Sequence, residues 1–143
     1  MSSTGLAVFD KTLQESHVWL NTVMTTLGTE QKEDAYAALK AVLHALRDRI
    51  GPENAVHLGA QLPLLLRGVY YEGWHPAKTP TRERHLDDFL AGVADRLPDK
   101  LAPQPERVAR AVFDAIWKRI DAGEVAKLIE MFPRELRDLW ASA

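Results

Sequence analysis

The stretch LPLLLRGVYYEGWHP, residues 62–76, is the most apolar part of the chain and turns abruptly into its least regular part. Between positions 64 and 71 only Arg67 is charged. A surface helix shows a single apolar stripe, so a turn that is apolar nearly all round is expected to be enclosed from several sides. The sequence therefore predicts that residues 64–70 lie at the centre of the molecule.

The end of this stretch has the chemistry of a loop. Gly73, Trp74 and Pro76 bring together a helix-ending glycine, a large aromatic side chain and a proline. We therefore expect a connector at residues 73–81, with helices on both sides of it.

Apolar residues recur at steps of three and four in six segments, which is the period of one helix face. These segments span residues 6–27, 35–50, 52–72, 86–97, 108–120 and 125–140. Pro63 and Pro133 lie inside the third and the sixth segment, and each is expected to break its helix because proline has no backbone N–H. Thr81 is the expected N-cap of the fourth helix. The pattern predicts an all-α helical bundle that forms a single domain over residues 1–143.

The helical segments also repeat along the chain. An offset of 70 residues, without a gap, aligns matching residues in three successive helices, for example Leu20 with Leu90, Val42 with Val112, Arg49 with Arg119 and Pro63 with Pro133. One register kept over three helices predicts an internal duplication. The fold is thus expected to consist of two pseudo-symmetric three-helix units, at about residues 6–72 and 82–141, with the third helix of each unit broken at proline.

The two predicted units differ in their third helix. Leu64, Leu65 and Gly68 of the first unit correspond to Arg134, Glu135 and Asp138 of the second. We expect the first of these helices to be enclosed between the halves and the second to be half exposed. In a rival interpretation, the apolar face of residues 64–70 meets a second subunit, because large exposed apolar patches mark interfaces. A structural homo-oligomer is therefore an alternative.

The composition restricts the classes of partner. Eighteen basic and 20 acidic side chains give a formal net charge of −2, which disfavours nucleic acid and anionic membranes as partners. The chain has no cysteine, which excludes disulfides, thiolate zinc sites and thiol nucleophiles and fits a reducing compartment. The amino terminus does not resemble a signal peptide, and no window approaches the roughly 20 apolar residues of a membrane span. We expect a cytoplasmic protein that does not enter a membrane.

Two segments carry a resemblance to a known family. The residues LLRGVYYEGWHP, followed by RERHLDDFLAGV, resemble the bacterial family catalogued as domain of unknown function 2267. The similarity covers residues 8–140, and YYEGW is its most recognisable part. The resemblance implies a small, all-helical, cytoplasmic bacterial protein. It implies no activity, substrate or cofactor, so it assigns no role to any residue.

The residues around the connector are the candidates for binding. Tyr70, Tyr71 and Trp74 surround the one connector that the repeat does not duplicate, and such aromatic side chains can stack on a ligand or anchor a partner. They can equally fill the seam between the two halves, which is the interpretation we favour. Arg67 requires a partner in its apolar surroundings: either a carboxylate, from Glu72, Asp87 or Asp88, or a bound anion. The candidate binding residues are Arg67, Tyr71, Glu72, Trp74 and His75.

A metal site is the alternative. Glu72 and His75 are three residues apart, as are His85 and Asp88 on the next helix. Imidazole and carboxylate groups could together supply four ligands to zinc or iron, in a metal-binding protein or a metal-dependent enzyme. This spacing is weak evidence. Di-iron bundles carry two Glu-x-x-His motifs and two further glutamates, and the second repeat unit here ends without the histidine of a second motif.

No constellation typical of catalysis is found elsewhere in the sequence. A Gly-x-Ser-x-Gly elbow and a glycine-rich phosphate loop are both absent. The leading hypothesis is therefore a small non-enzymatic binding or regulatory module without a cofactor. Its expected recognition surface is residues 70–81, and its partner is a protein or a small molecule whose identity the sequence does not give.

Overall fold

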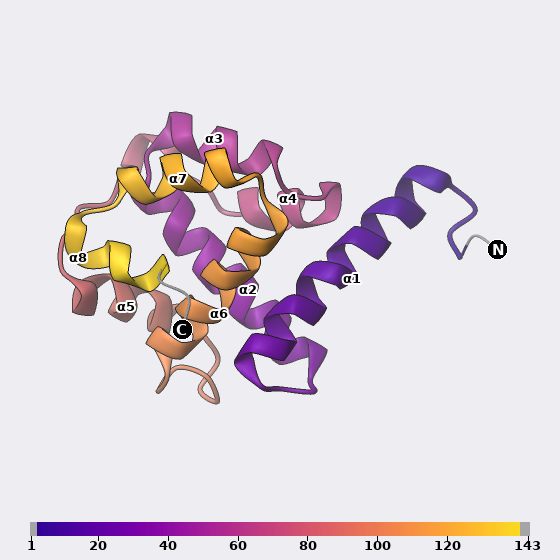
Figure 1. The fold of residues 1–143 in the computed structure, drawn as a ribbon, viewed down its shortest axis with the longest axis horizontal. Coiled ribbons are helices and arrows are strands. Elements are labelled where there is room, and N and C mark those ends of the chain that lie inside the picture. Colours follow the sequence, from indigo (N-terminus) through magenta and orange to yellow (C-terminus); the bar gives the residue numbers. More distant parts are fainter. Residues whose placement is uncertain (1–2, 141–143) are drawn as a thin grey trace.

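The computed structural model describes residues 3–140, and within them every regular element is a helix (Figure 1). The elements are α1 (Ala7–Leu27), α2 (Lys32–Arg49), α3 (Pro52–Ala60), α4 (Leu64–Tyr71), η1 (Pro76–Lys78), α5 (Leu86–Asp95), α6 (Pro105–Arg119), α7 (Ala122–Met131), α8 (Arg134–Arg137) and η2 (Asp138–Trp140). The prediction of an all-α fold is confirmed, and the helices pack as a bundle. None of the helices in the described part of the chain is long and apolar enough to cross a membrane.

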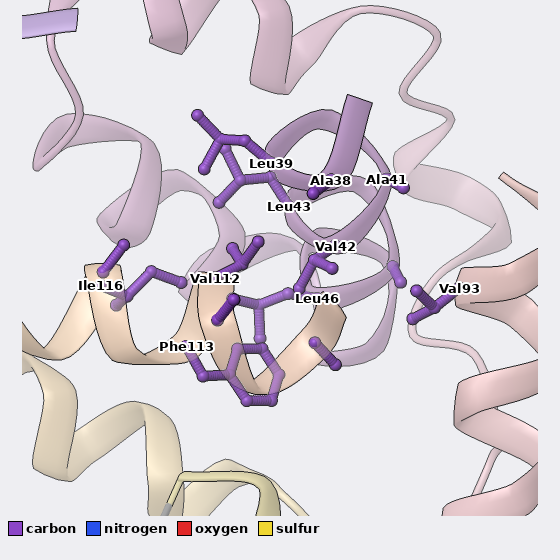
Figure 2. Packing of buried hydrophobic residues seen from close by; sticks show 14 of the residues in the cluster. Ala38, Leu39, Ala41, Val42, Leu43, Leu46, Val93, Val112, Phe113 and Ile116 are labelled. Carbon is purple, nitrogen blue, oxygen red and sulfur yellow. The ribbon is translucent and has the colours of Figure 1, made fainter. Parts of the chain in front are cut away.

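Helix α2 lies at the centre of the molecule. It contacts α1, α3, α4, α5 and α6 and is buried on most of its circumference. Figure 2 shows its side chains Val42 and Leu46 packed beside Val112 and Phe113 of α6. Four alanines of α2, at positions 35, 38, 41 and 45, are also buried. Their small side chains let the neighbouring helices approach α2 closely from several directions.

The prediction that residues 64–70 occupy the centre is wrong. In α4 only Leu66 and Tyr70 are buried, whereas Leu64 is 51% exposed and Leu65 is 46% exposed. The helix is apolar nearly all round, but only one of its faces lies against the core. Burial here depends on how many helices surround a segment: the alanine-rich α2 contacts α1, α3, α4, α5 and α6, whereas the main neighbours of α4 are α1, α2 and α3.

The two prolines break their helices as predicted. Helix α3 ends at Ala60 and α4 begins at Leu64, while α7 ends at Met131 and α8 begins at Arg134. Pro63 and Pro133 are the N-cap residues of α4 and α8, with ψ angles of 148° and 150°.

Helix boundaries recur 70 positions apart along the chain. Helices α2 and α6 end at Arg49 and Arg119, and α3 and α7 begin at Pro52 and Ala122. The duplication itself stays a prediction, which superposition of residues 16–70 on residues 86–140 tests. The first helices differ in length, since α1 has 21 residues and α5 has 10. The amino-terminal half of α1 extends away from the body of the molecule (Figure 1).

The prediction that Thr81 caps the fourth helix is wrong. Helix α5 begins at Leu86, and its N-cap residue is His85. The backbone N–H of Thr81 instead donates a hydrogen bond to the carbonyl oxygen of Asp48 in α2, at 2.8 Å. This contact holds the chain in an irregular conformation beside α2, so the helix starts later.

Candidate functional site

A buried arginine of α2 holds the end of α4. Arg47 is 4% exposed, and its Nη1 donates to the carbonyl oxygens of Tyr70 at 2.7 Å and Glu72 at 2.9 Å. Its Nε and Nη2 donate to the carboxylate of Asp48 at 2.8 and 3.2 Å. The last carbonyls of a helix have no partner within the helix and carry partial negative charge, so a guanidinium satisfies both needs there. Arg47 therefore fixes the point at which α4 passes into the connector.

Two more side chains of α2 continue this contact along the same face. His44 Nε2 lies 2.7 Å from the carbonyl oxygen of Val69, and because a carbonyl only accepts, Nε2 carries the proton. Lys40 Nζ lies 3.1 Å from Glu72 Oε1. Lys40, His44 and Arg47 are spaced by four and three residues, which places them on one side of the helix.

The far end of the connector is also attached to α2. In addition to the Thr81 contact, Arg49 Nε donates to the carbonyl oxygen of Glu83 at 2.8 Å. The carboxylate of Asp48 also accepts from Nη2 of Arg96, the C-cap residue of α5, at 3.2 Å. We call the α2 side chains Lys40, His44, Arg47, Asp48 and Arg49 the α2 clamp. The connector is thus a loop whose two ends are fixed by one helix.

The structure gives Arg67 a structural role. Its Nε donates to the carbonyl oxygen of Gly59 at 2.9 Å, and its Nη2 donates to that of Leu62 at 3.1 Å, so it caps the end of α3. Arg137 makes the related contact at the end of α7, where its Nε donates to the carbonyl oxygen of Phe132 at 3.0 Å. The expected carboxylate partners of Arg67 were therefore wrong, because the nearest acceptors are backbone carbonyls left free by the proline break.

The aromatic side chains of the site pack against α3. The Tyr70 ring is fully buried, and its hydroxyl donates to the carbonyl oxygen of Ala55 at 2.7 Å, while burial raises the pKa of the phenol. Tyr71 is half-buried, with its ring centroid 5.0 Å from that of Tyr70 and 5.4 Å from that of Trp74. Tyr71 and Trp74 both pack against the hydrophobic core. Together with Tyr70 they form an aromatic cluster at the start of the connector.

Gly59 of α3 lies directly against the rings of Tyr70 and Tyr71, and the lack of a side chain there lets them pack closely. This contact gives a first prediction. A Cβ at position 59 would press on Tyr71 Oη and lie 2.7 Å from Tyr71 Cζ. We expect Gly59→Ala to lower the free energy of unfolding by about 1–3 kcal/mol, as overpacking does in other cores. Urea unfolding followed by circular dichroism measures this loss.

Gly68→Ala is the matched control, because a Cβ on Gly68 of α4 meets no atom within 4 Å. It is expected to raise the free energy of unfolding by about 0.5–1 kcal/mol, through helix propensity alone. Equal effects of the two substitutions would contradict a close packing of Tyr71 on α3.

The pKa of His44 gives a second prediction. Burial lowers this pKa, and the nearby charges of Arg47, Lys40 and Arg96 lower it further, against the opposing hydrogen bond to Val69. The unfolded chain, with a histidine pKa of about 6.5, therefore binds more protons than the folded chain once the pH falls below that value. We expect the melting temperature to fall between pH 7.5 and 5.5, and to fall less in His44→Gln.

His57→Gln, a substitution of an exposed histidine, provides the comparison. An unchanged pH dependence of the melting temperature in His44→Gln would contradict the effect assigned to His44.

The carboxylate of Glu135 affects stability at lower pH than His44 does. Its hydrogen bond with His85 lowers its pKa below the ordinary 4.5, so stability from this carboxylate is lost only as the pH falls through that lower value.

The structure does not assemble the alternative metal site. Glu72 pairs with Lys40, His75 Nδ1 lies 2.9 Å from the carbonyl oxygen of Gly73, and His85 Nδ1 lies 3.0 Å from Glu135 Oε2. Asp88 is exposed on α5. Within residues 3–140, no three histidine or carboxylate side chains gather closely enough to hold a metal ion. The four candidate ligands are not brought together, because Glu72 faces Lys40 and His85, the N-cap residue of α5, faces Glu135.

Arg47 is the site residue that the sequence did not single out. In the sequence it is one of two arginines in the last turn of α2, where a cation complements the helix dipole. It lies four residues after Leu43 and three before Ile50, both buried, so spacing alone could have placed it on the buried face of α2. A buried arginine requires several acceptors, and this one receives them from α4 and Asp48.

The fold and the site define a class of protein: an all-helical domain in which one loop is clamped to a central helix. A family model described as an uncharacterized conserved protein (DUF2267) matches residues 16–139. The chain belongs to this family, which confirms the resemblance found in the sequence. No curated protein matches the chain.

Proposed function

We propose that this protein is a non-enzymatic binding module whose recognition surface is the connector and its flanks, residues 70–84. The observation that supports the proposal is the α2 clamp, which fixes the backbone of this segment from Tyr70 to Glu83. A loop held in one conformation before binding loses little conformational entropy on binding. Tyr71 and Trp74, which pack against the hydrophobic core, also hold the start of this loop in place.

The outer side chains indicate the chemistry of the partner. His75, Lys78, Arg82 and Arg84 are exposed, whereas the one acidic side chain at the start of the loop, Glu72, is paired with Lys40. The outer face of the loop therefore carries positive charge. Lysine and arginine bind carboxylates through charge-assisted hydrogen bonds, so the partner we propose is an acidic segment of another protein.

A labelled decapeptide of glutamate and aspartate tests this proposal by fluorescence anisotropy at low salt. The triple variant Lys78→Glu, Arg82→Glu, Arg84→Glu is expected to bind it at least about tenfold more weakly than the wild type, because rim charges set electrostatic affinity. The control changes Lys32, Lys118 and Lys127 to glutamate, which alters the net charge equally at exposed positions outside the connector. Equal losses in both variants, or no binding by the wild type, would contradict the proposal.

A further inference from the structure

An apolar hollow lies between the amino-terminal half of α1 and helix α4. It has a volume of about 440 Å³, and its lining includes Phe9, Thr12 and Leu13 of α1 with Leu64, Leu65 and Gly68 of α4. We call this feature the α1–α4 hollow. It is separate from the connector, whose clamp belongs to α2.

Large apolar side chains around the hollow are exposed together. Phe9, Leu64 and Leu65, which line the hollow, are 52%, 51% and 46% exposed. Leu6, one turn before Phe9, is 48% exposed. Single exposed apolar residues are ordinary, but a contiguous group that surrounds a concave surface is typical of an interaction site.

The hollow is a built part of the fold. The backbone N–H of Leu65 donates to Thr12 Oγ1 at 2.8 Å, which ties the start of α4 to the extending half of α1. At the tip of α1, the backbone N–H and hydroxyl of Thr4 donate to Asp10 Oδ1 at 3.1 and 2.8 Å. Gly68 has open space where a side chain would lie, which deepens the hollow. Hydrogen bonds therefore fix both walls.

The second half of the chain shows that the helical fold does not require this apolar surface. The positions 70 residues beyond Leu64, Leu65 and Gly68 hold Arg134, Glu135 and Asp138. There Glu135 pairs with His85, and the chain 70 residues beyond the extending half of α1 is loop and short 3₁₀ helix. Two features found only in the first half, a longer α1 and an apolar face on α4, therefore meet at the hollow.

We infer that the α1–α4 hollow is the interface at which a second copy of this chain binds, forming a two-fold symmetric dimer. The area supports this partner. Leu6, Phe9, Leu64 and Leu65 are each about half exposed. If a large apolar side chain offers roughly 150–200 Å², these four together present apolar surface on the order of 350 Å². A standard interface buries about 800 Å² on each partner, of which slightly more than half, about 450 Å², is apolar. The hollow and its rim supply most of that amount.

The shape and charge of the surface also fit a second copy. A two-fold interface uses the same patch on both subunits, so the patch must contain both the projecting and the receiving element. Phe9 and Leu64 line the hollow and are each about half exposed, so every copy offers both exposed apolar side chains and a concave surface. The nearby charges of Lys11 and Glu15 have opposite sign and lie 3.9 Å apart, so two copies of this rim do not repel each other.

Sedimentation velocity and light scattering on the full chain test the inference. At about 50 µM, above the micromolar dissociation constants of the weaker standard-size interfaces, the wild type is expected at twice its chain mass of 16.1 kDa. The triple variant Leu64→Arg, Leu65→Glu, Gly68→Asp gives α4 the residues found 70 positions later, at Arg134 and Glu135 of α8 and Asp138 of η2. Its dissociation constant is expected to rise at least about 100-fold.

The control variant Val56→Glu, Met131→Arg changes two apolar side chains that are 51% and 43% exposed but lie outside the hollow, and it should remain dimeric. Circular dichroism and thermal unfolding establish that each variant is folded. A wild type that stays at one chain mass overturns the inference, even if the hollow binds another molecule. A dimer that the hollow variant does not weaken also overturns it. Neither result affects the connector, whose peptide binding is measured separately.

Discussion

Arg47→Ala is expected to lower the free energy of unfolding by about 3–5 kcal/mol, the range seen when one partner of a buried charge pair is removed. The substitution leaves the carbonyl oxygens of Tyr70 and Glu72 without the donor that the guanidinium supplies. Each buried acceptor that loses its partner costs about 1–3 kcal/mol. It also removes the closest cation from the carboxylate of Asp48.

Thermal unfolding and urea titration measure this effect. For a chain of this size, a loss of 3–5 kcal/mol lowers the melting temperature by about 6–20 °C. Arg84→Ala is the control, since Arg84 is exposed, and it should change the free energy of unfolding by less than about 0.5 kcal/mol. A loss in Arg47→Ala below about 1 kcal/mol would contradict the central role of the α2 clamp.

Hydrogen exchange adds a local readout to the same experiment. If Arg47 holds the end of α4, its removal increases amide exchange at residues 70–84 more than in α6, because the local opening of a segment follows the contacts that anchor it. A uniform increase over all helices would instead indicate a purely global effect on stability. The two results separate a role in shaping the connector from a role in core packing.

Local features of the fold could be predicted from the sequence because they depend on neighbouring residues. The spacing of apolar residues predicted the helices, and the missing backbone N–H of Pro63 and Pro133 predicted where the third and sixth helical segments break. The family resemblance rests on the same kind of local evidence, since YYEGW is a contiguous segment.

Burial could not be predicted in the same way, because it depends on which helices become neighbours. The apolar residues Leu64 and Leu65 are half exposed, while alanines of α2 such as Ala38 are fully buried. The hydrophobicity of a side chain sets the free energy that its burial contributes. Whether the side chain is buried depends on how the other helices pack around it. The alanine-rich α2 has a small side-chain surface and for that reason accommodates many neighbours.

For the candidate site, the sequence singles out the segment around the connector, and in the structure Tyr71 and Trp74 lie in contact there. That this segment is a binding site stays a proposal. The anchor could not be found from local sequence, because Arg47 is separated from its acceptors by more than twenty residues. The proposed metal site failed for a related reason, since spacing along the chain did not reveal that His85 faces Glu135.

Phe113→Ala is the second substitution with a large expected effect, a loss of about 3–5 kcal/mol as in other buried aromatic truncations. Phe113 of α6 is 1% exposed, and its ring stacks on Trp140 with centroids 4.3 Å apart and planes 6° apart. Its centroid also lies 6.0 Å from that of Phe132 and 6.4 Å from that of Phe89. The substitution therefore removes one member of a four-ring cluster that joins α5, α6 and the carboxy-terminal segment.

Trp117→Ala is the control for this experiment, because Trp117 lies one turn further along α6 and is 50% exposed. It removes a larger side chain, so a loss near that of Phe113→Ala would mean that side-chain size rather than burial sets the cost. We expect a loss below about 1 kcal/mol, since an exposed side chain leaves no cavity when it is removed. Near-ultraviolet circular dichroism adds a specific test: Phe113→Ala should change the tryptophan signal by freeing Trp140 from its stack.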